Sequence, residues 1–329
     1  MKRKIFLSRR VPERVRGELE RLFELAQHDS ERPLGRESLL AGVAGRHGVV
    51  TMLTDRVDDE LLDAAGPELR VVANYAVGYD NVDVEAATRR GVVVSNTPDV
   101  LTEATAELTL ALMLALARRL AEGDRFIRRR EEWVWAPTFM LGTTLRGRTL
   151  GIVGLGRIGS AVARLARAHA MNVVYTNRSG STDAELERVT LDELLARADV
   201  VSLHCPLTPE THHLIGAAEL RAMRRDAFLV NTTRGPVVDE EALAEAVRNG
   251  EIAGAALDVF EREPEVSESL LDLENVVLVP HLGSATDETR EAMGMLCVSA
   301  LRAVLVDNRC PENAVNPEAW EAAAARASG

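Results

Sequence analysis

The sequence predicts an α/β protein made of two doubly wound domains, each with a parallel sheet between layers of helices. Its 329 residues exceed what one hydrophobic core of ordinary size accommodates, so two domains are expected. Short apolar runs alternate with segments of helical spacing along the chain, which is typical of parallel sheets. A glycine-rich turn near the middle of the chain marks the second domain.

The first hundred residues predict one domain without a phosphate-type glycine turn. The expected strands are 4–7, 47–53, 70–73 and 91–94. The expected helices between them are 12–25, 58–64 and 84–90. Pro98 lies in the segment that ends this domain, and the very apolar stretch 103–120 that follows predicts a long buried helix.

The segment 74–83, N-Y-A-V-G-Y-D-N-V-D, follows an expected strand at the carboxyl edge, where open sheets place ligands. Val77 and Gly78 could present two backbone N–H groups to a carboxylate there. The alternative is a plain turn in which Asp80 and Asp83 act as turn and cap residues. The residues alone favour the plain turn, because glycine turns are common.

Aromatic residues gather in the irregular stretch 125–148, which contains Trp133, Trp135 and Phe139 in a chain with three tryptophans. Large apolar side chains on a loop indicate an interface or a substrate lid. We favour a subunit contact. Leu53 and Trp135 are candidates for limiting the size of a substrate side chain.

The stretch 149–159, T-L-G-I-V-G-L-G-R-I-G, reads as a strand that leads into a helix through a glycine turn. Gly154 and Gly156 let the backbone approach a pyrophosphate, and Gly159 lets the helix expected at 160–170 pack on the strand. The N-terminus of that helix offers N–H groups and a positive dipole to the anion. A turn that serves packing alone is the alternative, but the strand, the spacing and the helix together favour nucleotide binding.

The strand expected at 172–176 ends at Asn177, Arg178 and Ser179. NAD-binding domains of this kind carry an acid at this point, which holds the ribose hydroxyls, and this chain has none. An arginine beside two short polar residues suits a 2′-phosphate, so NADP is expected in preference to NAD. If Arg178 merely lies over the adenine, NAD serves as well.

Four further strands are expected in the second half of the chain, each followed by polar residues. The strands are 199–203, 227–231, 254–257 and 276–279, and the polar residues follow at 204–206, 232–235, Asp258 and 281–284. Parallel strands bring their carboxyl ends to one edge, so these clusters predict one site. A final long helix is expected at 285–306, and the Ala-rich tail from Pro317 is expected to fray.

The formal net charge of -12 argues against nucleic acid or an anionic membrane as a partner, because polyanions bind basic surfaces. The three cysteines lack C-x-x-C spacing, which fits unpaired thiols in a reducing compartment, and no metal site is expected. The basic N-terminus has no long apolar segment, and no apolar run approaches the length of a membrane span. A soluble, cytoplasmic protein is therefore expected.

Three residues at the strand ends form a chemical set. They are Arg234 in N-T-T-R-G, Glu263 in D-V-F-E-R-E-P and His281 in V-P-H-L-G-S. Taken singly, a surface ion pair, a turn acid and a satisfied core histidine explain them equally well. Behind a nucleotide-binding turn, the three together indicate a catalytic group.

The sequence resembles the D-isomer-specific 2-hydroxyacid dehydrogenase family from about Lys4 to Pro317. Five motifs in order carry the resemblance: G-L-G-R-I-G at 154–159, H-C-P-L-T-P-E-T at 204–211, N-T-T-R-G-P-V-V-D at 231–239, A-L-D-V-F-E-R-E-P at 256–264 and P-H-L-G-S at 280–284. Within the family it is most similar to glyoxylate and hydroxypyruvate reductases, with which it shares the A-V-G-Y-D-N turn, a W-x-P segment and an N-R-S cofactor turn.

The resemblance implies a Rossmann dinucleotide-binding domain, residues 100–285, inserted into a flavodoxin-like substrate-binding domain, residues 1–99 and 286–329. It implies reduction of a small 2-oxo acid, glyoxylate or hydroxypyruvate, to the D-2-hydroxy acid by NAD(P)H. The implied catalytic residues are Arg234, Glu263 and His281, with His281 as general acid.

The resemblance also implies the binding residues. Val77 and Gly78 hold the substrate carboxylate, Asp258 faces the nicotinamide carboxamide, and Trp135 reaches the partner subunit's site, so a homodimer is expected. The expected cofactor contacts are Gly154, Leu155, Gly156, Arg157, Ile158, Gly159, Asn177, Arg178, Ser179, Cys205, Pro206, Thr211, Thr232, Thr233, Arg234, Asp258, His281 and Gly283.

Other functions of the same framework stay open. D-3-phosphoglycerate dehydrogenase is disfavoured because the loop around Val77 offers no extra cation for a phosphate. Phosphite and formate dehydrogenases are disfavoured because the chain lacks a lysine at Val77 and a long N-terminal extension. A corepressor-like scaffold that senses the cofactor is the non-enzymatic alternative, and turnover of NADPH with a 2-oxo acid separates it from an enzyme.

Overall fold

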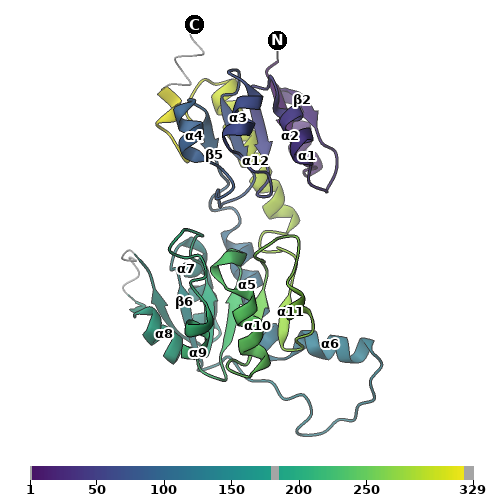
Figure 1. The fold of residues 1–329 in the computed structure, drawn as a ribbon, viewed down its shortest axis with the longest axis vertical. Helices are drawn as coiled ribbons and strands as arrows, with labels where there is room; N and C mark the ends of the chain where they lie inside the picture. Colours follow the sequence, from purple (N-terminus) through teal and green to yellow (C-terminus); the bar gives the residue numbers. More distant parts are fainter. Residues whose placement is uncertain (1, 179–184, 322–329) are drawn as a thin grey trace. The chain divides into compact units, whose positions relative to one another are not determined.

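The fold is described on a computed structural model, which covers residues 2–178 and 185–321 (Figure 1). The chain forms two compact units. The first consists of the residues up to Leu101 and those from Thr286 onward, and the second runs from Thr102 to Ala285. The domain breaks expected after residues 99 and 285 lie within two residues of these.

The first unit has a five-stranded parallel sheet in the order β2-β1-β3-β4-β5, which is the flavodoxin-like order. Alternate strand residues face opposite sides, so Phe6, Val49, Val72 and Val94 share one core with the helices α2, α3 and α4. The strands are β1 (Lys4–Leu7), β2 (Glu24–Gln27), β3 (Gly48–Thr51), β4 (Val71–Asn74) and β5 (Val93–Ser95). The helices are α1 (Glu13–Leu22), α2 (Arg36–Val43), α3 (Asp59–Ala65), α4 (Val84–Arg89) and α12 (Asp287–Leu305).

The second unit has a seven-stranded parallel sheet in the order β12-β11-β10-β9-β6-β7-β8. Counted from β6, this is the Rossmann order with one strand added beyond β11. The strands are β6 (Thr149–Val153), β7 (Asn172–Thr176), β8 (Glu187–Arg188), β9 (Val200–Leu203), β10 (Phe228–Asn231), β11 (Gly254–Leu257) and β12 (Val276–Leu278). The helices are α5 (Thr102–Ala117), α6 (Leu120–Arg128), α7 (Arg157–Ala168), α8 (Leu191–Arg197), α9 (Ala217–Ala222), α10 (Glu240–Arg248), α11 (Glu268–Leu271) and the short 3-10 helix η1 (Gly235–Val237). The predicted fold class, two doubly wound parallel-sheet domains, is confirmed.

The structure departs from the expected elements at two places. The helix expected at 12–25 ends at Leu22, and β2 follows directly as an edge strand. The helix expected at 103–120 is divided, because Arg119 adopts a left-handed conformation with φ of 53° between α5 and α6. The polypeptide therefore changes direction before α6, and α6 with its following loop extends away from the body of the second unit (Figure 1).

Candidate active site

The polar clusters of the second unit follow β6, β9, β10, β11 and β12 at one edge of the sheet. β10, β11 and β12 are neighbours, and their carboxyl ends lead to Arg234, Asp258 and His281. β6 and β9 are also neighbours, and the chain order reverses between them. Open α/β sheets bind ligands at such a switch point, so the edge combines a ligand position with chemically active residues.

His281 and Glu263 form a direct pair. The His281 Nδ1 atom lies 2.8 Å from Glu263 Oε2, while Glu263 Oε1 accepts a hydrogen bond from the Phe260 N–H group at 3.0 Å. Burial alone would raise the pKa of Glu263. The hydrogen bond to His281, the positive charges of His281 and Arg234, and the hydrogen bond from the Phe260 N–H group outweigh it and hold this pKa below its usual value. Glu263 is therefore a carboxylate at neutral pH, and it orients the histidine through one ring nitrogen.

Arg234 is fixed through its backbone. Its carbonyl oxygen accepts a hydrogen bond from Asn231 Nδ2 at 2.9 Å, and η1 begins at the next residue. The charge of Arg234 acts on Glu263, so the guanidinium belongs to the same electrostatic group as the histidine pair. The three predicted catalytic residues thus come together in the second unit.

Asp258 holds the turn that carries the histidine. Its side chain is buried, and its two oxygens accept hydrogen bonds from the Leu282 and Gly283 N–H groups. His281 itself has a left-handed backbone with φ of 53°, which this turn stabilises. Burial raises the pKa of Asp258, against the two N–H bonds and the charge of His281. The structure thus gives Asp258 a positioning role, and its contact with a nicotinamide stays a prediction.

The glycine turn has the shape that a dinucleotide requires. Gly154 has φ of 98°, and a Cβ atom there would lie 2.7 Å from the Cys205 backbone nitrogen. A Cβ atom at Gly159 would lie 2.3 Å from the Gly154 oxygen, so α7 can approach β6 only with glycine at this position. A Cβ atom at Gly156 would meet nothing within 4 Å, which leaves this side of the turn open to a ligand. The turn and the start of α7 therefore fit a pyrophosphate.

The end of β7 carries the residues predicted to select the cofactor. Asn177 Oδ1 accepts a hydrogen bond from the Leu155 N–H group at 2.6 Å, so its side chain braces the glycine turn. Arg178 is 83% exposed and forms a loose ion pair with Glu210 at 3.9 Å. Arg188, which the sequence reasoning missed, donates to the Asn177 carbonyl at 2.6 Å and adds a second guanidinium near this turn. Ser179 lies outside the described residues.

The segments after β9 and β10 are joined by threonine side chains. Thr233 Oγ1 donates to the Cys205 carbonyl at 2.5 Å, and Thr232 Oγ1 lies 3.0 Å from the Thr109 hydroxyl of α5. Thr211 Oγ1 donates to the Pro206 carbonyl at 2.7 Å and so closes its own turn. Burial raises the pKa of the Cys205 thiol to about 11, which leaves it protonated and unreactive at neutral pH.

Sequence reasoning also missed a pair of acids that lies next to the predicted catalytic residues. The Glu240 N–H group donates to Glu261 Oε1 at 2.9 Å, and the Glu261 N–H group donates to Glu240 Oε1 at 2.6 Å. This reciprocal bond joins the start of α10, which follows the Arg234 segment, to the segment that carries Glu263. The D-E and E-R-E spacing alone gives no sign of it, because the contact depends on how the two segments pack.

The predicted substrate residues of the first unit lie at the ends of β3 and β4. Leu53 follows β3, and Val77 and Gly78 follow β4, on adjacent strands. Among the described residues, neither the Val77 nor the Gly78 N–H group donates a hydrogen bond to the protein. Asp83, by contrast, accepts a hydrogen bond from the Ala86 N–H group and caps α4, as the turn interpretation predicts. Asp83 thus has the capping role of the turn interpretation, and carboxylate binding by Val77 and Gly78 stays a prediction.

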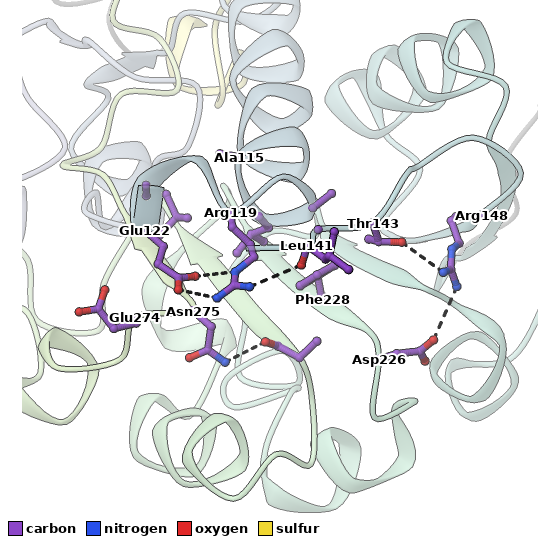
Figure 2. A pocket seen from close by; sticks show the side chains of 16 residues that line it. Ala115, Arg119, Glu122, Leu141, Thr143, Arg148, Asp226, Phe228, Glu274 and Asn275 are labelled. Atoms are coloured by element: carbon purple, nitrogen blue, oxygen red, sulfur yellow. Dashed lines mark hydrogen bonds and ion pairs between the residues drawn. The ribbon is translucent and has the colours of Figure 1, made fainter. Parts of the chain in front are cut away.

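A cavity of about 420 Å³ lies at the amino-terminal ends of the strands of the seven-stranded sheet, opposite the ends that carry the predicted catalytic residues (Figure 2). It is lined by the end of α5 and by residues at the starts of β10 to β12, among them Phe228 and Asn275. The Arg119–Glu122 pair and the Arg148 guanidinium border it (Figure 2). This cavity is distinct from the strand ends that carry the histidine.

Trp135, the predicted substrate residue of the second unit, lies in the loop after α6 and is 81% exposed.

Within the described part of the chain, no group of three or more histidine, cysteine or acidic side chains is arranged to hold a metal ion. No described helix has the length and apolar character needed to cross a membrane.

With a nucleotide-type turn and a hydrogen-bonded histidine–carboxylate pair at the carboxyl ends of one sheet, the second unit has the arrangement of a dinucleotide-dependent oxidoreductase. Residues 110–283 match the family described as D-isomer specific 2-hydroxyacid dehydrogenase, NAD binding domain. The chain belongs to this family and is an NAD(P)-dependent oxidoreductase.

Relatives cover nearly the whole chain. It is 47% identical to the glyoxylate reductase of Thermococcus litoralis over 326 residues, 97% of this chain and 98% of that protein. It is 49% identical to the glyoxylate reductase of Thermococcus gammatolerans, with 97% of each covered. Among solved structures, it is similar to the NADPH-dependent glyoxylate/hydroxypyruvate reductase of Sinorhizobium meliloti in complex with NADP and malonate, with a TM-score of 0.83, 35% identity, and 97% of this chain and 98% of that one covered.

Proposed function

We propose that the protein reduces glyoxylate or hydroxypyruvate to the corresponding 2-hydroxy acid, of D configuration where the product is chiral. The proposal rests on one observation, the His281–Glu263 pair at 2.8 Å, grouped with Arg234 on the sheet edge that also carries the glycine turn. The relatives named glyoxylate reductase support the choice of substrate. The second unit is the dinucleotide-binding domain in this proposal, and the first unit binds the substrate.

The reduced nicotinamide supplies the hydride. Glu263 occupies Nδ1 of His281, which leaves Nε2 as the atom that donates a proton to the substrate oxygen. The Glu263 carboxylate stabilises the protonated ring before the transfer. Arg234 stabilises the negative charge that develops on the same oxygen. The carboxylate of the 2-oxo acid binds the Val77 and Gly78 N–H groups, and Leu53 and Trp135 limit its side chain.

NADPH is the preferred cofactor in this proposal. Arg178 and Arg188 place two guanidinium groups near the end of β7, where an acid would otherwise hold the ribose hydroxyls. We expect kcat/KM with NADPH to exceed that with NADH by about tenfold or more, the scale of one charge-assisted hydrogen bond. A tenfold preference for NADH would contradict this assignment.

A homodimer completes the proposal. Helix α6 buries none of its side chains within the chain, and the loop after it exposes Trp133, Val134 and Trp135. Exposed apolar groups of this size indicate an interface. The cavity between the end of α5 and the start of α6 is lined by Leu141 of the same loop, and we propose that it also takes part in the contact with the second subunit.

The experiment is a panel of 2-oxo acids assayed by loss of NADPH absorbance, with His281→Ala alongside the unchanged protein. We expect turnover of glyoxylate and hydroxypyruvate, and a loss of about a hundredfold or more in kcat for His281→Ala with NADPH binding retained. Near-normal turnover of the variant would remove His281 from the mechanism. Absence of turnover with every 2-oxo acid would support the corepressor-like alternative.

A further inference from the structure

Buried polar side chains gather at the carboxyl edge of the first unit's sheet, and the proposed reaction gives them no role. Ser8, Thr51 and Asn74 are fully buried, and Asp55 is nearly so. Burying polar groups is unfavourable unless each finds a hydrogen-bond partner, so such a cluster indicates a hydrogen-bonded network that holds the local backbone in one conformation.

Two asparagines hold the carbonyl groups of the predicted carboxylate-binding loop. Asn74 Nδ2 donates to the Gly78 carbonyl at 2.9 Å, and Asn96 Nδ2 donates to the Val77 carbonyl at 2.7 Å. The N–H groups of Val77 and Gly78 have no partner within the described protein. Asn96 therefore fixes the peptide unit that carries the Gly78 N–H group, and Asn74 fixes the next peptide unit, while the two N–H donors stay open to a ligand.

A third asparagine joins this loop to the segment that contains Leu53. Asn81 Nδ2 donates to the Met52 carbonyl at 3.1 Å and to the Asp55 carbonyl at 2.9 Å. The same amide lies 3.2 Å from Asn74 Oδ1, so one hydrogen-bonded network spans both loops. A cavity of about 430 Å³ is lined by residues of both loops, including Leu53 and Asn81.

The partners of Asp55 extend the network to the first strand. Asp55 Oδ2 accepts hydrogen bonds from the Met52 N–H group at 2.8 Å and from the Ser8 hydroxyl. Thr51 Oγ1 donates to Asn74 Oδ1 at 3.2 Å. The loops after β1, β3 and β4 are thus braced against one another by side chains that are buried or partly buried.

We propose that Asn74 and Asn96 are positioning residues, which hold the Val77–Gly78 backbone as a preformed pair of N–H donors for the substrate carboxylate. Asn81 makes the Leu53 segment part of the same rigid body. The inference rests on the proposed function, because it takes these N–H groups as the carboxylate site. Fixed donors stabilise an anion without reorganisation at the moment of binding, so loss of the brace weakens binding of the carboxylate more than the chemical step.

The test uses Asn74→Ala and Asn96→Ala, singly. Each should raise KM for glyoxylate, and the inhibition constant of the dicarboxylate malonate, by about tenfold or more, with kcat within about threefold of the unchanged protein. The dissociation constant for NADPH should not change. Amide hydrogen exchange of the segment 75–81, measured by mass spectrometry without substrate, should become faster by about tenfold or more in each variant.

Asn316 provides the matched control. It is fully buried in the same unit, where its side chain accepts from the Val94 N–H group at 2.7 Å and donates to the Val92 carbonyl at 3.0 Å. Asn316→Ala removes a buried amide of the same kind without touching either loop. We expect it to lower the melting temperature while KM for glyoxylate and the exchange of segment 75–81 stay unchanged.

The outcomes separate the inference from the proposed function. If the unchanged protein reduces glyoxylate but the asparagine variants alter neither KM nor exchange, or if Asn316→Ala gives the same rise in KM, the positioning role is refuted. If no 2-oxo acid is turned over, the proposed function fails, and the exchange measurement still decides whether the asparagines fix the loop. Should either alanine variant not fold, Asn96→Asp keeps the shape, removes the donor to Val77, and is measured in the same way.

Discussion

The Glu263 carboxylate uses one oxygen for His281 and the other for the Phe260 N–H group. It therefore cannot turn without breaking a bond, and its charge lies against the ring that gives up the proton in the proposed reaction. The depressed pKa of Glu263 means that this charge persists to pH values below the usual range of a glutamate. The carboxylate of the proposed proton-transfer pair is thus charged at neutral pH.

Glu263→Gln should separate the shape of this residue from its charge. Glutamine keeps a hydrogen-bonding group at Nδ1 but no longer stabilises the protonated ring, so we expect kcat for reduction to fall by about tenfold or more. The measurement is kcat at neutral pH with saturating NADPH and glyoxylate. Glu265→Gln, the same change at an exposed position two residues on, should leave kcat unchanged, and an unchanged kcat in Glu263→Gln would refute the charge argument.

His204, at the end of β9, should control the stability of the protein in mild acid. Burial lowers the pKa of this histidine to about 4, and its Nε2 atom lies 2.8 Å from the Ser202 hydroxyl. The ring is uncharged in the folded protein, whereas the unfolded chain takes up the proton near pH 6.5. Unfolding is therefore favoured as the pH falls from about 6.5 towards 4, and above this window the effect vanishes.

His204→Gln should remove this loss. Between pH 7.5 and 5 the histidine lowers the free energy of unfolding by at most about 2 kcal/mol, because the residue as a whole is only partly buried. Urea unfolding of the protein without cofactor, at both pH values, measures the difference. Equal losses in the two proteins would show that other groups, such as His47, whose pKa burial also lowers, account for the acid sensitivity.

At the scale of elements, the segments after β10 and β11 touch through their backbones. A Cβ atom at Gly235 would lie 1.9 Å from the Phe260 carbonyl carbon and 2.0 Å from its oxygen. The reciprocal bonds of Glu240 and Glu261 hold the same contact from the side. Burial raises the pKa of Glu240, although the hydrogen bond from the Glu261 N–H group works to lower it. This reciprocal contact, which we call the Glu240–Glu261 clamp, therefore contains a poorly solvated acid.

Gly235→Ala should therefore damage both stability and activity. The methyl group meets backbone atoms rather than a flexible side chain, so the Arg234 and Glu263 segments must separate, at a cost of about 2–4 kcal/mol. Melting temperature and kcat measure the two effects. Gly17→Ala, in an exposed helix position with nothing within 4 Å, should be neutral or slightly stabilising. A fully active, fully stable Gly235→Ala would show that the segments can move apart freely.

Individual strands and contacts show which parts of the fold the sequence could predict. Buried strands such as β11 are predictable because apolar runs between turn residues have few other outcomes. β2 was missed because its side chains are only partly buried, and its residues continue the helical spacing before it. The positions of Arg234, Glu263 and His281 followed from motifs at strand ends. The Glu240–Glu261 clamp and the asparagine brace did not, because their hydrogen bonds join segments whose contact only the folded chain establishes.

At the scale of the whole molecule, the exposed apolar groups of the second unit are unevenly distributed. Trp133, Val134, Trp135 and Leu141 are more than half exposed, and all belong to the loop after α6. Trp133 stacks on Phe139 with ring centres 6.4 Å apart, and Phe139 meets Phe126 of α6, so the loop has some order of its own. A surface of this kind is costly in water, and the proposed second subunit would cover it.

Replacing Val134 with Asp should convert the proposed dimer into a monomer. Val134 is 80% exposed in the single chain, so a charge there does not disturb folding, but burying an unpaired carboxylate in an interface is strongly unfavourable. Light scattering after size-exclusion chromatography gives the mass directly. Leu271→Asp, a similar change at an exposed apolar residue of α11, should leave the dimer intact. If the unchanged protein is monomeric, or if Val134→Asp remains a dimer, the loop after α6 is not the subunit contact, and a site role for Trp135 in the neighbouring subunit fails with it.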